Sequence, residues 1–304
     1  MTLGKQASDP PCLSVFNPMM PGARLIKELE IGSFLTPPFP RDWPETLRVV
    51  SWNVNRGLQL NGIIEFLQSS SADLILLQET DVNARRTRHR NIPREIAQAL
   101  QMNYIFGREF EELTQGTEAS PAYHGQTTLS RLPLSNPRIL RFRDQSTFWR
   151  PRWFIPSLQS FQRRLGGRMA LICDITLQGR TFVLYNLHLE SRGNDELRIG
   201  QLAEMLTEIG KNPAATPLLV AGDFNFDLSR GPASTLIAGM RIGSPHASFG
   251  GRRTVPHSSH AKPAAIDWIL TRGALSASDP EIHESVTASD HFPLSLELRL
   301  LSPQ

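Results

Sequence analysis

Polar side chains recur in this chain directly after apolar runs that have the length of buried strands. Glu79 follows residues 74–77, and Asp223 and Asn225 follow residues 218–221. A carboxylate at the mouth of a buried strand is costly unless it is paired or bound to a metal. Because Mg²⁺ prefers oxygen ligands, Glu79 is predicted to bind a metal ion. Asp223 can orient water and Asn225 can donate to a phosphate oxygen, although this tetrapeptide is also typical of an Asx turn.

A second group of candidates combines carboxylates with imidazoles. Asp290 and His291 are adjacent and precede the last apolar run. Asp290 can bind a metal while His291 moves protons or steadies a phosphate. Asp267 is the acceptor expected to fix the tautomer of His291. His188 alternates with apolar residues near a strand end, which favours a phosphate contact over a core histidine, and Asn53 ends another strand.

The elements that must position these side chains alternate between strands and helices. Apolar runs predict strands at residues 47–53, 73–77, 104–106, 126–130, 168–175, 181–189, 218–221, 266–270 and 294–298. Helical spacing marks residues 63–67 and 96–100, and a third helix with one apolar face at Leu202, Met205, Leu206 and Ile209. Strands that are apolar on both alternations must be covered by helices or by a second sheet. The pattern therefore predicts an α/β domain.

Bulk properties bound the class of protein. The 304 residues are 40% hydrophobic and 20% charged, which suits one large soluble domain. The net charge of +3 suits a polyanionic partner without requiring one. Two cysteines exclude a disulfide framework. No run approaches the roughly 20 apolar residues of a spanning helix, and the first residues lack the apolar core of a signal peptide, so a cytoplasmic location is expected.

The first 45 residues differ from the rest of the chain because they are rich in proline. Proline fixes φ and lacks a backbone donor, so residues 1–45 are predicted to form an extended leader that packs on or trails from the domain. Within this leader, residues 24–29 are an alternative candidate for a short helix. The catalytic domain would then span residues 46–304.

The most distinctive segment covers residues 138–168, where arginines alternate with aromatic residues. This mixture suits a nucleic-acid groove, in which cations follow phosphates and rings stack on bases. Helical spacing of Phe154, Leu158, Phe161 and Leu165 fits a basic amphipathic helix on an anionic membrane instead. A packed flap with core aromatics is the third reading. This segment and the basic run at residues 85–90 give the candidate substrate contacts Arg86, Arg88, Trp149, Arg150, Arg152, Trp153 and Arg168.

The motifs together resemble the endonuclease/exonuclease/phosphatase superfamily. The resemblance rests on Trp52-Asn53, Gln78-Glu79, residues 125–133, Leu187-His188-Leu189, Gly222-Asp223-Phe224-Asn225, Ile266-Asp267-Trp268 and Ser289-Asp290-His291, in the family's order. It implies a four-layer α/β-β/α sandwich with two central mixed sheets, and hydrolysis of phosphoesters that depends on Mg²⁺ or Mn²⁺.

The resemblance also implies roles for the site residues. Glu79 would bind the metal, with Asn53 and Asp290 close by. Asp223 would activate or orient water, and Asn225 would hold a phosphate oxygen. His188 would contact the phosphate, and His291 would pair with Asp267. Whether Asp223 or His291 is the base stays open.

Motifs that a whole superfamily shares do not choose its substrate. His188 disfavours the abasic-site endonucleases, which typically carry Tyr near this position. Residues 188–193, with Arg198 and Gln201, are similar to the matching segment of tyrosyl-DNA phosphodiesterases. We therefore expect a monomeric nuclease or DNA-end phosphodiesterase with DNA as its partner. The alternatives are a sphingomyelinase- or inositol-phosphatase-like hydrolase that acts on lipid head groups at a membrane surface, and a non-catalytic binding module.

Overall fold

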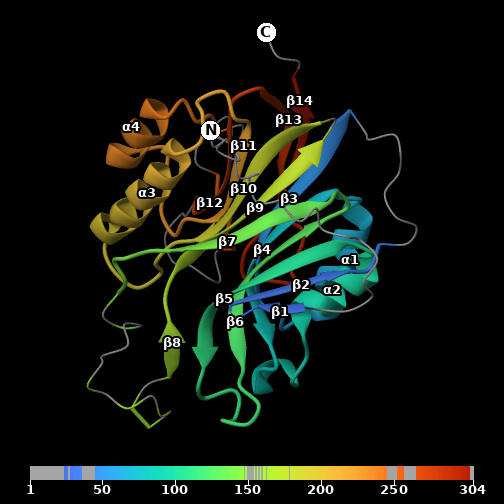
Figure 1. Cartoon of the computed structure of the whole chain (residues 1–304), viewed down its shortest axis with the longest axis vertical. Helices are drawn as coiled ribbons and strands as arrows, with labels where there is room; N and C mark the ends of the chain where they lie inside the picture. Colours follow the sequence, from blue (N-terminus) through green and yellow to red (C-terminus); the bar gives the residue numbers. More distant parts are fainter. Residues whose placement is uncertain are drawn as a thin grey trace, which may run out of the picture.

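A computed structural model describes residues 24–26, 28–35, 45–146, 148, 154, 156, 158, 160–161, 163–177, 179–244, 252–256 and 265–301. Two sheets face each other, and each carries helices on its outer side (Figure 1). None of the helices in these residues is long and apolar enough to cross a bilayer.

The larger sheet contains nine strands within the described residues. They are β1 (Arg24–Ile26), β2 (Leu29–Ser33), β3 (Thr46–Arg56), β4 (Leu74–Val82), β5 (Asn103–Glu112), β6 (Tyr123–Ser130), β8 (Arg164–Gly166), β13 (Leu275–Ile282) and β14 (Leu294–Leu300). Their order is β1-β2-β5-β6-β4-β3-β14-β13, and β8 pairs with β5. The sheet is mixed, because β3 and β4 are parallel whereas β14 is antiparallel to β3.

The smaller sheet has five strands in the same described residues. They are β7 (Leu134–Arg141), β9 (Met169–Leu177), β10 (Arg180–His188), β11 (Leu218–Asp223) and β12 (Asp267–Arg272), in the order β12-β11-β10-β9-β7. This sheet is mixed as well, because β10 and β11 are parallel and their neighbours are antiparallel.

Three apolar cores hold the layers together. The helices are α1 (Leu60–Ser70), α2 (Ile92–Leu100), α3 (Asp195–Gly210) and α4 (Gly231–Gly239), with a short 3-10 turn, η1, at Arg85–Thr87. One core lies between the sheets, one joins α1 and α2 to the larger sheet, and one joins α3 and α4 to the smaller sheet. The predicted face of α3 is buried, and the Asn194 side chain caps this helix by accepting from the amide of Leu197.

The predicted four-layer sandwich is confirmed, and all nine predicted strands are present. The short helix around residues 24–29 is wrong, because Arg24–Ile26 form β1 and Leu29 begins β2. The helical reading of Leu165 is also wrong, because Leu165 lies in β8 opposite Glu111. Local spacing did not reveal β7, β13 and α4, whose apolar patterns are weak. In α4, for example, the buried residues are Ala233 and Ile237.

Candidate active site

The predicted site residues meet at one end of the sandwich because the strands that carry them end or begin there. His188 and Asp223 are the last residues of the parallel strands β10 and β11 and lie opposite each other in the register. Asp267 begins the antiparallel strand β12 opposite Asp223. Asn53 lies near the end of β3, and His291 precedes β14, the antiparallel neighbour of β3.

Gly222 allows this end of β11 to lie close to β10. Its φ is +149°, and a Cβ at this position would collide with the carbonyl oxygen of Leu187. Only glycine fits such a close approach of two backbones. The glycine of the Gly222–Asn225 motif therefore has a structural task, which is to bring Asp223 against the strand that ends in His188.

One carboxylate oxygen, Oδ2 of Asp223, lies close to three other side chains of the site. The Asn53 amide Nδ2 donates to it over 3.1 Å. The Nε2 atoms of His188 and His291 lie 3.5 Å and 3.7 Å from the same oxygen. The other oxygen, Oδ1, accepts the backbone amide of Asn225 over 2.8 Å. Donors thus surround a carboxylate that is only 1% exposed, which fixes its orientation.

His291 is held between two carboxylates. Its Nδ1 donates to Oδ2 of Asp267 over 2.9 Å, and Thr254 Oγ1 donates to the same oxygen over 2.6 Å. Burial opposes the charged imidazole, but Asp267 and Asp223 raise the pKa of His291 to about 10. Burial, with a smaller contribution from Asp267, raises the pKa of Asp223 to about 7. Near neutral pH His291 is therefore a cation, and Asp223 can take up a proton.

Glu79 owes its position to an irregularity at the end of β4. The pairing of β4 with β6 shifts register between Leu77 and Thr80, and Glu79 has a φ of +55°. Such bulges re-aim a side chain next to a site. Burial alone would raise the pKa of Glu79, but Arg56, 3.4 Å away, and more distant cations lower it well below its usual range. The carboxylate is therefore ionised.

The oxygen atoms at this end of β3 and β4 suit a hard divalent cation. Glu79 offers an ionised carboxylate that is 17% exposed, and Asn53 offers an amide oxygen. Asp290 is tied to the same place through Ser289, whose Oγ donates to the Asn53 carbonyl over 2.7 Å and to Asp290 Oδ1 over 3.3 Å. The donor chemistry of Asn53, Glu79 and Asp290 thus fits Mg²⁺ or Mn²⁺.

A different group of side chains is close enough to share one ion. Within the described residues, ligand atoms of Asp223, Asp267 and His291 all lie within 4.8 Å of one another. This cluster is not the predicted ligand set. The attraction between a protonated His291 and its two carboxylates accounts for the short distances without an ion.

Arg168 was predicted to contact substrate, but it is buried behind the site and is only 2% exposed. It donates to Glu109 Oε1 over 2.6 Å, to His188 Nδ1 over 2.9 Å and to Ser191 Oγ over 2.8 Å. Glu109 lies in β5 of the larger sheet and His188 in β10 of the smaller one. Arg168 therefore links the two sheets directly behind a site residue.

Arg86, the second predicted substrate contact, also binds the protein itself. Its guanidinium donates to both carboxylate oxygens of Asp81, over 2.6 Å and 2.8 Å, and to Glu112 over 3.0 Å. His124 Nδ1 donates to Asp81 Oδ1 over 2.8 Å. Because Asp81 follows Glu79 by two residues in β4, this cluster anchors the strand end that carries Glu79.

The remaining predicted substrate contacts are Arg88 and four residues between positions 149 and 153. Arg88 is exposed beside the segment that follows β3. Trp149, Arg150, Arg152 and Trp153 lie outside the described residues. Nearby aromatic side chains are exposed and not core, at 59% for Phe148 and 63% for Phe154. Arg192, just beyond the end of β10, stacks over Phe148 at 5.3 Å.

Sequence reasoning missed several members of this site. Glu109 holds Arg168, Arg56 faces Glu79, and Thr254 donates to Asp267. Glu109 carried no clear signal, because Arg108, Glu111 and Glu112 surround it in β5 and make this part of the strand look exposed. Thr254 carried no signal either, since it stands in a loop whose proximity to Asp267 depends on the tertiary fold.

Comparisons with known proteins assign the chain to a family and a fold. A family model described as the endonuclease/exonuclease/phosphatase family matches residues 50–291, well over half of the chain. No curated protein matches the chain. Several solved structures share its fold.

Three of these structures illustrate the likeness. An endonuclease/exonuclease/phosphatase from Beutenbergia cavernae DSM 12333 is 17% identical with a TM-score of 0.62, over 84% of this chain and 72% of that one. The human Nocturnin catalytic domain is also 17% identical with a TM-score of 0.62, over 84% of this chain and 93% of that one. A humanised D. rerio TDP2 is 18% identical with a TM-score of 0.55, over 84% and 100% of the two chains. At this identity the structures establish the fold alone.

Enzymes of the matching family hydrolyse phosphoester bonds and typically use divalent metals. The chain belongs to the endonuclease/exonuclease/phosphatase family.

Proposed function

We propose that this chain is a divalent-metal-dependent phosphodiesterase that acts on nucleic acid, as a nuclease or a DNA-end phosphodiesterase. The observation that carries the proposal is the position of Asp223 Oδ2, which the Nε2 atoms of His188 and His291 approach to 3.5 Å and 3.7 Å. Glu79 lies at the end of a neighbouring pair of strands. A carboxylate between two imidazoles, beside an ionised glutamate, suits an attack of water on a phosphodiester.

Asp223 is the general base in this proposal. A base works best when its pKa lies near the working pH, and burial raises the pKa of Asp223 to about 7. His291 is a poor base because its pKa of about 10 keeps it protonated. Asp223 Oδ2 would take a proton from the attacking water, while Asn53 and the amide of Asn225 hold the carboxylate in place.

The two histidines act as donors to the phosphate. Protonated His291 can donate from Nε2 to a phosphoryl oxygen and offset its charge, while Asp267 stabilises the cation from behind. His188 can donate from Nε2 because Arg168 occupies its Nδ1. Fixed donors aimed at developing negative charge are a large source of rate enhancement. Asn225 uses its side-chain amide on the Leu189 carbonyl, so its backbone and turn position Asp223.

Glu79, Asn53 and Asp290 would hold the divalent cation through their oxygen atoms. A bound Mg²⁺ or Mn²⁺ would supply Lewis acidity and neutralise phosphoryl charge. Arg56, whose guanidinium lies 3.4 Å from Glu79 Oε2, adds positive charge beside this group of oxygen atoms.

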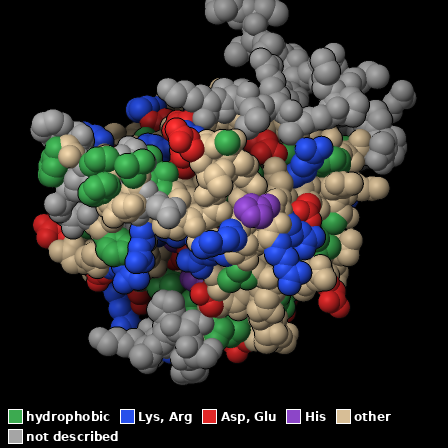
Figure 2. All heavy atoms as spheres, turned by 90° about the horizontal axis from the view of Figure 1, so that it is seen from below, with side chains coloured by type: hydrophobic (Ala, Val, Ile, Leu, Met, Phe, Trp, Pro, Cys, Tyr) green, Lys and Arg blue, Asp and Glu red, His purple; other side chains and the backbone are tan. Residues whose placement is uncertain are grey.

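A nucleic acid is the substrate that the surroundings favour. Figure 2 shows Lys and Arg side chains gathered on the face seen from below in Figure 1, the end that carries η1 and β8. Cations of this kind attract a phosphate backbone. Phe148 lies near the site with its ring more than half exposed, and it can stack on a base. Residues 188–193, which resemble tyrosyl-DNA phosphodiesterases, lead out of β10 toward this face.

A lipid substrate is the second candidate because of a specific observation. Phe154, Leu158 and Phe161 are each about 60% exposed, and exposed apolar side chains beside arginines can also enter a membrane interface. Such a substrate predicts release of phosphocholine or inositol phosphate from vesicles. It also predicts that the triple exchange of these residues for serine abolishes vesicle binding.

One substrate panel tests these proposals together. Single- and double-stranded DNA, single-stranded RNA, and vesicles with sphingomyelin or phosphoinositides are incubated with Mg²⁺, Mn²⁺, Ca²⁺ or EDTA, with Asp223→Asn as the matched control. We expect metal-dependent cleavage of a polynucleotide and none with EDTA. Hydrolysis confined to the lipids would favour the second candidate. If no substrate is hydrolysed with any metal across a range of salt, the proposed function is wrong.

A further inference from the structure

A hollow of about 460 Å³ opens beside the candidate active site, and arginines provide all the charged side chains of its lining. Its walls come from residues 57–62, which lead from β3 into α1, and from Arg86, Thr87, Arg88 and Arg90, which follow β4. No Asp or Glu is among the residues that line it in the described part of the chain. A cavity lined by charges of one sign concentrates the opposite ion. The hollow therefore suits an anion.

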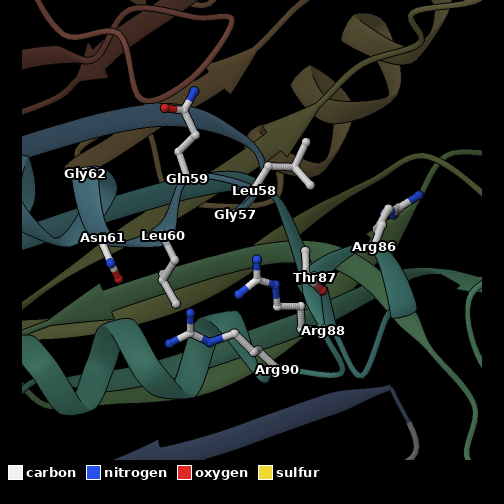
Figure 3. A pocket seen from close by; sticks show the side chains of 10 residues that line it. All are labelled: Gly57, Leu58, Gln59, Leu60, Asn61, Gly62, Arg86, Thr87, Arg88 and Arg90. Carbon is white, nitrogen blue, oxygen red and sulfur yellow. The ribbon is translucent and has the colours of Figure 1, made fainter.

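Two arginines face the hollow, and one does not. Figure 3 shows the guanidinium groups of Arg88 and Arg90 pointing toward Leu60 and Asn61, while Arg86 points away. Arg86 forms ion pairs with Asp81 and Glu112. Arg90 Nε donates to Glu95 Oε2 over 2.8 Å. Arg88 is exposed, and no ion pair of its side chain is found within the described residues. Arg88 is thus the cation that an incoming anion can engage without breaking an internal pair.

The opposite wall adds weaker attraction for an anion. α1 begins here with Leu60, its N-cap Gln59 makes no capping bond through its side chain, and its first turn holds no acidic residue. Amides in the first turn of a helix lack intrahelical partners and point toward the solvent. Leu58, which is 51% exposed, adds an apolar surface at the rim. This combination suits a phosphate that carries a sugar or base better than a bare ion.

The hollow begins next to the predicted metal site. Gly57 follows Arg56, whose guanidinium is 3.4 Å from Glu79 Oε2. The second wall leaves the same strand that carries Glu79. In a polynucleotide, phosphates recur about every 3.4 Å along the axis of a strand. A polynucleotide strand bound at the site therefore carries further phosphates on either side of the cleaved bond, and the hollow adjoins the two β-strands that end at Arg56 and after Glu79.

Resting on the proposed function, we propose that this hollow is a subsite for a phosphate of the polynucleotide strand outside the bond that is cleaved, and that Arg88 is its main ligand. The subsite adds affinity for oligonucleotides but takes no part in the chemistry. Small phosphodiesters with a single phosphate do not reach it. The chain therefore discriminates a strand from a small ester through Arg88.

The test uses Arg88→Gln in the full chain, because this exposed position can lose its charge without disturbing the fold. Arg299→Gln is the matched control, since Arg299 is 58% exposed near the opposite end of β14. Binding of a fluorescein-labelled 12-nucleotide DNA strand is measured by anisotropy in EDTA, where cleavage does not occur. Hydrolysis of bis(4-nitrophenyl) phosphate is measured separately with Mg²⁺ or Mn²⁺.

We expect Arg88→Gln to weaken binding of the strand about fivefold to tenfold and to reduce the salt dependence by roughly one released counterion. Hydrolysis of the small ester should stay within about twofold, and Arg299→Gln should resemble the wild type in both assays. The proposal is overturned if Arg88→Gln binds the strand like the wild type. It is also overturned if Arg88→Gln loses binding to phosphatidylserine vesicles instead. A wild type that hydrolyses no ester refutes the proposed function, while the EDTA measurement still decides the subsite.

Discussion

Arg168 donates a hydrogen bond from Nη1 to Nδ1 of His188 over 2.9 Å. A guanidinium has donors only, so this ring nitrogen must accept. The proton of the neutral imidazole is therefore on Nε2, which lies 3.5 Å from Asp223 Oδ2. Burial and the charge of Arg168 lower the pKa of His188 well below its usual range. His188 is thus a fixed donor toward the site.

Removing this contact should disturb catalysis more than binding. Arg168→Met combined with Glu109→Gln removes both members of the closer ion pair of Arg168, while Glu190, 4.0 Å from Arg168, keeps its hydrogen bonds from the backbone amides of Ser146 and Arg192. We expect kcat to fall by about 10- to 100-fold, as for other residues that orient a site histidine, with a smaller change in KM. Nitrogen-15 NMR of the histidines should show the Nε2–H tautomer of His188 only in the wild type. The same tautomer and titration in both proteins would contradict this role of Arg168.

The pH dependence of hydrolysis should report the charge on His291. The rate should rise as Asp223 loses its proton near pH 7 and fall as His291 loses its proton near pH 10. Asp267→Asn removes the main charge that raises the pKa of His291, so the alkaline fall should move to lower pH. Profiles of kcat against pH for the two proteins measure this shift. An alkaline limb at the same pH in Asp267→Asn would refute the assignment.

Metal binding should depend on the ionised carboxylate of Glu79. Glu79→Gln keeps the shape of the side chain but removes the negative charge that a hard cation prefers. We expect the Mg²⁺ concentration for half-maximal activity to rise by more than about tenfold. Isothermal titration with Mn²⁺ gives an independent readout of affinity, with Glu284→Gln, an exposed carboxylate paired with Arg252, as the control. Equal Mn²⁺ affinity in Glu79→Gln and the wild type would exclude Glu79 as a ligand.

The cluster around Asp81 should stabilise the fold in a way that depends on pH. Burial disfavours the charge, but hydrogen bonds from Arg86 and His124 lower the pKa of Asp81 below its ordinary value of 3.8. A lowered pKa stabilises the native state above the unfolded pKa, and this stability is lost as the pH falls through the folded pKa. Asp81→Asn should therefore destabilise the protein by about 3 kcal/mol at pH 7, and by clearly less in strong acid.

Urea denaturation at pH 7 and pH 2.5 tests this difference. Asp195→Asn serves as the control, because Asp195 forms a surface pair with Arg198 and its side chain is 72% exposed. An exposed pair of this kind contributes less than about 1 kcal/mol. A destabilisation by Asp81→Asn that is equal at both pH values would show that its charge plays no part.

Much of this fold could be predicted because its signals are local. Strands such as β4 and β11 are short apolar runs that end in polar residues, and α3 has one apolar face. The strand ends also identify Glu79, Asp223 and His188, since a polar group there has no local partner. Parallel strands that end at the same edge then bring such residues together.

Partners that lie far apart along the chain could not be predicted in this way. Arg168 and Arg86 stand in basic stretches typical of substrate contacts, but Arg168 meets the buried Glu109 of β5, and Arg86 meets Glu112 of the same strand in addition to Asp81, five positions before it. Arg168 and Glu109 are separated by 59 positions. Composition cannot tell an arginine that faces solvent from one that closes an internal ion pair. Arg88, with the same local signal as Arg86, remains exposed.

Asp223 lies between two imidazoles, and one measurement tests its role as the general base most directly. Hydrolysis of an oligonucleotide by the wild type and by Asp223→Asn is compared in Mg²⁺ and in EDTA, after circular dichroism has shown that both proteins are folded. We predict metal-dependent cleavage by the wild type and a loss of about 1,000-fold in kcat for Asp223→Asn, within the range of a positioned general base. Cleavage by Asp223→Asn at the wild-type rate would contradict the account.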